Sequence, residues 1–269
     1  MLQFAANLTM LYSELDFLDR FAAAKEAGFA GVEFLFPYAY PEAEVAHRLH
    51  AAGLTQVLFN LPAGDWAAGE RGITALPDRV DEFRAGIPKA IAYARALGCT
   101  QINALAGKAP LGTEHALLHA TFVDNLRFAA NALGEAGIRL VIEAINTRDI
   151  PGFFLSTSAQ AFAIIDEVGS PNLRFQYDIY HMQRMEGELA ATIEQNIARI
   201  GHLQLADNPG RHEPGTGEIN YPFLFTVLER AGYDGWIGCE YVPQAGTDAG
   251  LGWLSDYRQL AHATVGATG

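Results

Sequence analysis

Four oxygen-bearing side chains stand near the ends of four short apolar runs in the second half of the chain. Glu143 follows Leu-Val-Ile, Asp178 follows Phe-Gln-Tyr, and Glu240 follows Ile-Gly-Cys. The fourth is Gln204, which follows Gly-His-Leu. Taken singly, a carboxylate at a strand end is as consistent with a helix cap or a salt-bridge partner as with a catalytic group. If the four converge, the three carboxylates repel one another unless a cation lies between them, and an all-oxygen set favours Mg2+ or Mn2+ over Zn2+.

Other polar residues are placed to contact a substrate beside such a metal. His181 lies three residues after the aspartate in DIYH, although a histidine satisfied within a loop is equally consistent with this position. Arg211, in DNPGRHEPGTGE, is a candidate anchor for an acidic substrate because a guanidinium binds a carboxylate through two parallel hydrogen bonds. Lys108 is a second candidate anion contact. Glu70 lies in the long Gly-rich segment FNLPAGDWAAGERG, which is either a lid or an ordinary surface loop.

Short apolar runs alternate with longer amphipathic ones along the whole chain. The runs rich in β-branched and aromatic residues predict strands, and the amphipathic runs, several of which stop at a glycine, predict helices. The predicted strands are 3–8, 31–36, 55–61, 100–107, 138–146, 173–178, 201–207 and 235–241. The predicted helices are 15–28, 43–53, 84–98, 115–137, 158–169, 189–201, 222–232 and 253–266.

Eight strand–helix units in 269 residues give a mean spacing of roughly 34 residues, which is typical of a (β/α)8 TIM barrel of the α/β class. A dinucleotide-binding fold would place GxGxxG after the first strand, where this chain has LTMLYSELD instead. With no linker and no low-complexity tract, residues 1–269 are predicted to form one catalytic domain. Active sites of this fold lie at the carboxyl ends of the strands, where the four oxygen-bearing residues stand.

Composition narrows the choice of function. The net charge of −13 argues against binding to nucleic acid or to an anionic membrane surface. No apolar run approaches the roughly 18 residues of a membrane span, and the N-terminus has no positively charged leader. The two cysteines, Cys99 and Cys239, do not suggest a disulfide framework, so a cytoplasmic location is expected.

Several segments resemble the hydroxypyruvate isomerase family of xylose isomerase-like barrels, which also include ketose 3-epimerases and the endonuclease IV type of repair enzyme. The resemblance runs nearly end to end, and its most specific parts are FNLPAGDWAAGERG and the series DIYHMQ, GHLQLAD and GRHEPGTGEI. The barrel pattern alone is not specific to this branch.

The resemblance implies that Glu143 and Glu240 transfer protons through an enediolate between hydroxypyruvate and 2-hydroxy-3-oxopropanoate. It places the divalent metal on Glu143, Asp178, Gln204 and Glu240. It also assigns His181 and Arg211 to positions that contact substrate oxygens. The related epimerases usually have a histidine at the position of Gln204, and an amide oxygen is a weaker ligand than an imidazole, so the resemblance predicts a modest metal affinity for this chain.

Two alternatives keep the same two glutamates and change the substrate. This branch is also similar to 2-oxo-tetronate isomerases, which act on a four-carbon sugar acid, and more distantly to ketose 3-epimerases. A non-catalytic sugar-acid sensor would lack one of the glutamates, and a repair nuclease would have extra histidine ligands for zinc. The expected partner is therefore a small 2-oxo sugar acid. A homo-oligomer, a dimer or a tetramer, is expected from relatives.

Overall fold

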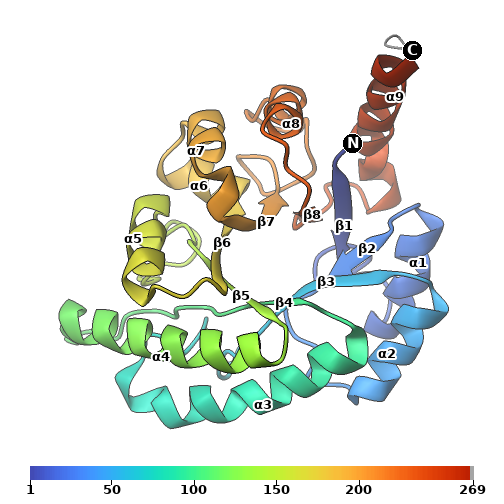
Figure 1. Cartoon of the computed structure of the whole chain (residues 1–269). Coiled ribbons are helices and arrows are strands. Elements are labelled where there is room, and N and C mark those ends of the chain that lie inside the picture. The colour runs from blue at the N-terminus through green and yellow to red at the C-terminus, as the bar shows by residue number, and fades with distance from the viewer. Residues whose placement is uncertain (267–269) are drawn as a thin grey trace.

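Eight parallel strands close into a single barrel, in the order of the sequence, and helices surround it (Figure 1). This computed structural model describes the backbone of residues 1–266 and the side chains of residues 1–259. The strands are β1 Gln3–Asn7, β2 Gly31–Glu33, β3 Thr55–Asn60, β4 Gln101–Asn103, β5 Arg139–Glu143, β6 Leu173–Asp178, β7 Ile200–Leu205 and β8 Trp236–Cys239. The predicted (β/α)8 barrel is confirmed, with each strand inside its predicted range or within one residue of it.

The helices follow the predicted pattern with one addition. They are α1 Arg20–Glu26, α2 Glu42–Ala51, α3 Val80–Leu97, α4 His115–Glu135, α5 Ser158–Val168, α6 Ile179–Met185, α7 Leu189–Asn196, α8 Tyr221–Arg230 and α9 Gly252–Gly266. The short helix α6 was not predicted, because its seven residues carry no long amphipathic pattern. Within residues 1–266, no helix combines the length and the apolar character that crossing a lipid bilayer requires.

Local signals explain several helix ends. The Thr157 hydroxyl accepts a hydrogen bond from the backbone of Gln160 at the start of α5, and Asn220 does the same for Phe223 at the start of α8. Helix α5 ends at Gly169, whose φ of 69° is the left-handed conformation that glycine adopts without strain.

Apolar packing occurs in two separate places. A large cluster fills the space between the strands and the surrounding helices. A smaller cluster contains Ala5, Val57, Leu58 and Val141, against which Trp236 packs. Because side chains alternate along a strand, Val141 shares a face with Glu143, two residues later. Apolar side chains therefore lie beneath the carboxyl end of β5 on the face that carries its glutamate.

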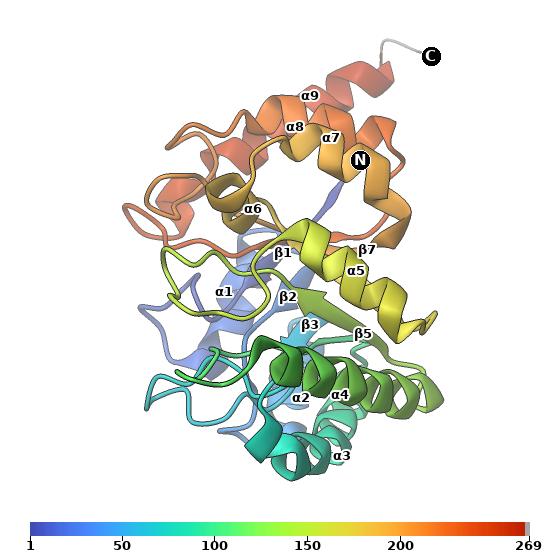
Figure 2. The same cartoon turned by 90° about the vertical axis from the view of Figure 1, so that its left-hand side faces the viewer.

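The register of the strands brings polar residues together at the carboxyl ends. Asp178 of β6 pairs with Gln204 of β7, which in turn pairs with Gly238 of β8. Asn7 of β1 pairs with Glu33 of β2. The long loops that leave these strand ends project from one side of the molecule, to the left in Figure 2.

Gly238 makes room for a buried glutamate. A Cβ atom at this position would lie 2.3 Å from both carboxylate oxygens of Glu33, which is itself 1% exposed. No real side chain tolerates that distance, so the glycine allows Glu33 to occupy the barrel interior.

Gly238→Ala should therefore lower the free energy of unfolding by about 1–3 kcal/mol, because the added methyl group must displace the buried glutamate. Gly252→Ala is the matched control, since a Cβ at Gly252 meets nothing within 4 Å among the described residues. That control should change stability by no more than about 0.5 kcal/mol. Urea denaturation of both variants measures the difference, and equal stabilities would contradict this reading of Gly238.

Candidate active site

Four titratable side chains converge at the carboxyl end of the barrel. Glu143, Asp178, His181 and Glu240 are all buried, and one ligand atom from each lies within 4.8 Å of the others. Glu143 ends β5 and Asp178 ends β6, whereas Glu240 directly follows β8. The fold thus brings together residues that are up to 97 positions apart in the sequence.

Asp178 has a second task, which explains the helix that follows it. Its Oδ1 accepts hydrogen bonds from the backbone N–H groups of Tyr180 at 2.8 Å and His181 at 3.2 Å. This is an N-cap, and it starts helix α6 directly at the strand end. The cap turns His181 back toward the cluster, with its Nε2 atom 3.6 Å from Asp178 Oδ2 and 3.8 Å from Glu143 Oε1.

Arg211 supplies the positive charge at this cluster. Its Nη2 atom donates to Glu240 Oε2 at 2.5 Å and lies 3.7 Å from Asp178 Oδ2. The loop that follows β7 holds Arg211 with a φ of 57°, which is uncommon for a residue with a side chain. The guanidinium therefore compensates part of the negative charge that the carboxylates bring into the barrel.

Loss of solvent dominates the electrostatics of the carboxylates. Burial raises the pKa of Glu143 well above its ordinary value, and repulsion from Glu240 and Asp178 adds to this effect. Burial also raises the pKa of Glu240 to about 8, against the opposing attraction of Arg211. The pKa of Asp178 is raised for the same first reason. Without a bound cation, Glu240 therefore holds its proton at neutral pH, and burial disfavours the ionised forms of Glu143 and Asp178 as well.

His181 is affected in the opposite direction. Burial lowers the pKa of its imidazole well below 6.5, and the nearby Arg211 lowers it further. The ring is therefore neutral at physiological pH, with one nitrogen carrying a hydrogen and the other a lone pair.

A second group of polar residues is attached to the carboxylate cluster. Glu33 accepts from Gln204 Nε2 at 2.8 Å and from Asn7 Nδ2 at 2.9 Å, and its other oxygen lies 2.6 Å from His202 Nε2. Asn7 Nδ2 also lies 3.3 Å from Glu240 Oε1. His202 and Glu33 are almost completely buried, so the Nε2 atom of His202 and the carboxylate of Glu33 meet where water is excluded.

The predicted ligand Gln204 sits at the edge of the cluster. It pairs with Asp178 in the register of β6 and β7, and its Oε1 accepts from Gln176 Nε2 at 2.6 Å. Sequence reasoning overlooked Gln176, Asn7 and Asn60. The sequence did contain a signal for Gln176, because it precedes Asp178 by two residues on the same strand and its side chain therefore points to the same face.

Glu143 is oriented by asparagines from the neighbouring strands. Asn103 Nδ2 lies 3.3 Å from Glu143 Oε2 and donates to Asn60 Oδ1 at 3.1 Å. These amides solvate a carboxylate from which water is removed. The sequence shows them only as polar residues at the ends of apolar strands.

The residues fit a divalent cation. Asp178 Oδ2 is buried and has no hydrogen-bond donor among the described side chains and backbone groups. Such an oxygen costs free energy unless a cation or a proton neutralises it. Together with two buried glutamates and His181 it belongs to a group of side chains that could hold a metal ion.

One buried aspartate organises the loop after β7. Asp207 accepts four backbone hydrogen bonds, at 2.9–3.0 Å, from Asn208, Gly215, Gly217 and Ile219. Because each N–H comes from a different part of the loop, this one carboxylate gathers the segment that carries Arg211.

Two predicted substrate contacts lie elsewhere at the same end of the barrel. Glu70 forms an ion pair with Arg79 at 2.5 Å, and this hydrogen bond lowers the pKa of Glu70. Glu70 and Lys108 line a depression of about 610 Å3 together with Arg71. Trp66, from the same loop, packs edge-on against Phe36, with ring centroids 5.0 Å apart. The structure therefore places Glu70 and Lys108 at the same depression, whereas Arg211 and His181 lie at the carboxylate cluster.

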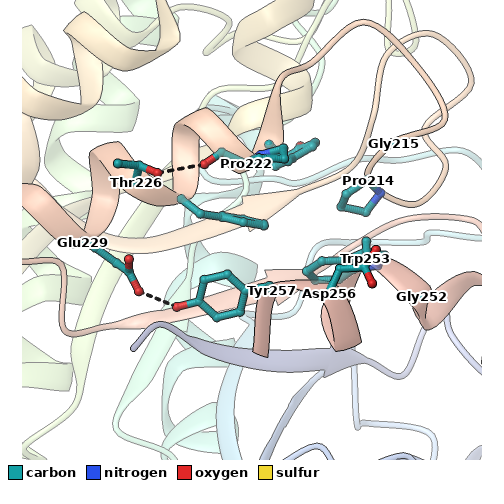
Figure 3. A pocket seen from close by; sticks show the side chains of 11 residues that line it. Pro214, Gly215, Pro222, Thr226, Glu229, Gly252, Trp253, Asp256 and Tyr257 are labelled. Carbon is teal, nitrogen blue, oxygen red and sulfur yellow. Dashed lines mark hydrogen bonds between the residues drawn. The ribbon is translucent and has the colours of Figure 1, made fainter. Parts of the chain in front are cut away.

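Another cavity, of about 460 Å3, lies between α8 and α9 (Figure 3). Two of the polar groups that line it bond to their neighbours, since Tyr257 donates to Glu229 at 2.7 Å and Thr226 donates to the Pro222 carbonyl at 3.1 Å. The other lining residues include the aromatic rings of Tyr221, Phe225 and Trp253. This groove therefore offers apolar packing, and the converging acid–base groups lie at the barrel mouth.

Several known proteins are similar to this chain in sequence or in structure. Residues 21–257 match the model of the family described as xylose isomerase-like TIM barrel. The chain is 58% identical to hydroxypyruvate isomerase of Escherichia coli K12 over 258 residues, which is 96% of this chain and 100% of that protein. It is 54% identical to 2-oxo-tetronate isomerase of Cupriavidus necator over 255 residues, covering 95% and 98% of the two chains. A crystal structure from Brucella melitensis, described as an AP endonuclease of family 2, superimposes with a TM-score of 0.93 at 46% identity, covering 96% and 99% of the two chains.

The raised pKa of Glu240 predicts how stability depends on pH. The folded protein holds this proton up to about pH 8, whereas the unfolded chain releases it near pH 4.5, so the folded state binds more protons between these values. The stabilisation is fully present below pH 4.5 and is lost as the pH rises through 8. In EDTA, the free energy of unfolding of the wild type relative to Glu240→Gln should fall by about 1 kcal/mol per pH unit between pH 5 and 8. Parallel curves for the two proteins would contradict the assignment.

Proposed function

The chain belongs to the xylose isomerase-like TIM-barrel family and is an isomerase, and on this premise we propose that it interconverts hydroxypyruvate and 2-hydroxy-3-oxopropanoate. One observation carries the proposal: Glu143 and Glu240 present buried carboxyl groups to one small space that also holds His181 and Arg211. An aldose–ketose isomerisation needs a base and an acid beside adjacent carbons, with a hydrogen-bond donor for the oxygen that becomes negative.

In the proposed reaction, one of the two glutamates, as a carboxylate, removes a proton from the hydroxymethyl carbon of hydroxypyruvate. The electron pair of that C–H bond forms the enediolate double bond, and the ketone oxygen takes up the negative charge. A glutamate, as the carboxylic acid, then delivers a proton to the former ketone carbon. The hydroxyl proton of the terminal carbon passes to the former ketone oxygen, so that the terminal carbon becomes the aldehyde and the neighbouring oxygen becomes the hydroxyl of the product. His181 donates a hydrogen bond to a substrate oxygen during this charge development, and Arg211 binds the substrate carboxylate.

The proposed metal ligands are Glu143, Asp178, Gln204 and Glu240. A divalent cation bound there would supply electrostatic stabilisation to the oxygens of the enediolate. Mg2+ or Mn2+ is proposed because the donors are oxygens, and the buried Asp178 oxygen that accepts no hydrogen bond supports this choice.

A four-carbon substrate is the second candidate, favoured by the 54% identity to the 2-oxo-tetronate isomerase of Cupriavidus necator. The same glutamates would serve both reactions. The ratio of kcat/KM for hydroxypyruvate and the four-carbon 2-oxo acid decides between them, and a higher value for the three-carbon acid is expected.

Binding to nucleic acid is not proposed, although one similar structure is described as an endonuclease. A net charge of −13 disfavours contact with phosphates.

We propose that residues 1–269 act as one catalytic domain in the cytoplasm, as a homo-oligomer, and that Glu70 and Lys108 contribute to substrate binding from the neighbouring depression. Both cysteines are buried and free, which supports a reducing compartment.

Incubation with hydroxypyruvate in D2O tests the proposed reaction. Proton NMR should show deuterium entering the hydroxymethyl carbon while the aldehyde hydrate appears, because the enediolate exchanges its proton with solvent. EDTA should abolish the exchange, and added Mg2+ or Mn2+ should restore it. Folded protein that catalyses no exchange would show that hydroxypyruvate is not the substrate.

Replacing either proposed acid–base group should stop turnover. Glu143→Gln and Glu240→Gln should each lower kcat by at least about 100-fold, because an amide can neither accept nor deliver the proton. Glu218→Gln is the matched control, since Glu218 lies on the loop after β7, where it bonds to Gln183 and Asn208. Circular dichroism checks folding, and a wild-type rate in either active-site variant would refute the assignment.

A further inference from the structure

Asn146, which follows β5, has an amide group whose orientation is set by the backbone. It is completely buried, and its Oδ1 accepts hydrogen bonds from the N–H groups of Arg148 at 3.1 Å and Asp149 at 2.9 Å. If the amide were reversed, its NH2 group would face these two donors. The oxygen is therefore committed to the turn, and the nitrogen must point the other way.

The amide nitrogen of Asn146 faces two partners. It donates to Asp149 Oδ2 at 2.9 Å, and it lies 2.7 Å from His181 Nδ1. The amide nitrogen carries only hydrogens, so the imidazole nitrogen that it faces must be the acceptor. A neutral imidazole that accepts at Nδ1 carries its hydrogen on Nε2, and Nε2 is the atom that faces Glu143 and Asp178.

Asp149 is itself held in place from helix α6. Tyr180 Oη donates to Asp149 Oδ2 at 2.8 Å, and Arg184 forms an ion pair with Asp149 Oδ1 at 3.0 Å. Because His181 lies on the same helix, these contacts lock the loop after β5 to the element that carries the imidazole.

We propose that Asn146 is a positioning residue that fixes His181 in the tautomer with hydrogen on Nε2, so that His181 is a hydrogen-bond donor in the site and not a metal ligand. A metal ligand must offer a lone pair at the atom that faces the ion, and Nε2 offers a hydrogen. The remaining oxygen ligands are then Glu143, Asp178, Gln204 and Glu240. The acceptor of the hydrogen bond from His181 Nε2 would be a substrate oxygen, and only this point rests on the proposed function.

Nitrogen NMR reads the tautomer directly. In protein labelled with 15N at its eight histidines, two-bond 1H–15N spectra distinguish a protonated ring nitrogen from an unprotonated one. The signals of His181 are assigned from their loss in His181→Gln. The wild type should show Nε2 protonated and Nδ1 unprotonated, and the opposite pattern would overturn the proposal.

A pair of variants tests whether Asn146 is responsible. Asn146→Asp combined with Asp149→Asn exchanges the amide and the carboxylate, keeps an acceptor for the turn, and places a carboxylate oxygen against His181 Nδ1. That double variant should carry a hydrogen on Nδ1, whereas Asp149→Asn alone, in which Asn146 remains, should keep Nδ1 unprotonated. An unprotonated Nδ1 in the folded double variant would overturn the role of Asn146. If thermal melting shows it unfolded, the comparison is made with Asn146→Ala, which removes the side-chain donor without adding charge. There a newly populated Nδ1–H form supports the proposal, and an unchanged tautomer overturns it.

Titration with Mg2+ tests the exclusion of His181 from the metal site. The Nε2 nitrogen of the wild type should keep its hydrogen when the metal is added, and loss of that hydrogen would overturn the proposal. Turnover of hydroxypyruvate is measured in parallel on the same samples. Absence of turnover would refute the proposed function, whereas the tautomer of His181 is read without any substrate.

Discussion

The structure depends on holding several carboxyl groups in a barrel mouth from which water is largely excluded. Glu143, Asp178 and Glu240 are each at most 5% exposed, and Glu33 lies at the same end of the barrel at 1%. Uncompensated, this much buried negative charge would oppose folding. The surrounding side chains therefore consist mainly of groups that donate hydrogens, together with one guanidinium.

This constraint explains choices that are otherwise unrelated in the sequence. Asn7, Asn103 and Gln204 each donate an amide hydrogen to, or lie beside, a buried carboxylate. Gly238 lacks a side chain because Glu33 needs the space. Asp207 gathers the loop that carries Arg211, so even a residue outside the cluster serves to bring a positive charge to it.

The burial that disfavours ionised carboxylates also makes the site chemically useful. Groups whose charged form is disfavoured by burial can take up and release protons near neutral pH, which a proton-transferring enzyme requires. A neutral imidazole beside them can donate a hydrogen bond, and it does not itself take up or release a proton at neutral pH. The features that make this region costly to fold are therefore those that support the proposed isomerase.

The barrel could be predicted from the sequence because eight alternations of apolar strands and amphipathic helices leave few other topologies. Their places at strand ends likewise marked Glu143, Asp178, Gln204 and Glu240 as candidates. Which partners these residues meet depends on how the chain folds in three dimensions. Glu33 meets His202, 169 residues away, and Asn146 meets His181, 35 residues away. Such pairs depend on the register of the closed barrel and on side-chain orientation, and neither leaves a periodic signal in the chain. The short helix α6 escaped prediction for a related reason, since it begins where a buried aspartate caps it.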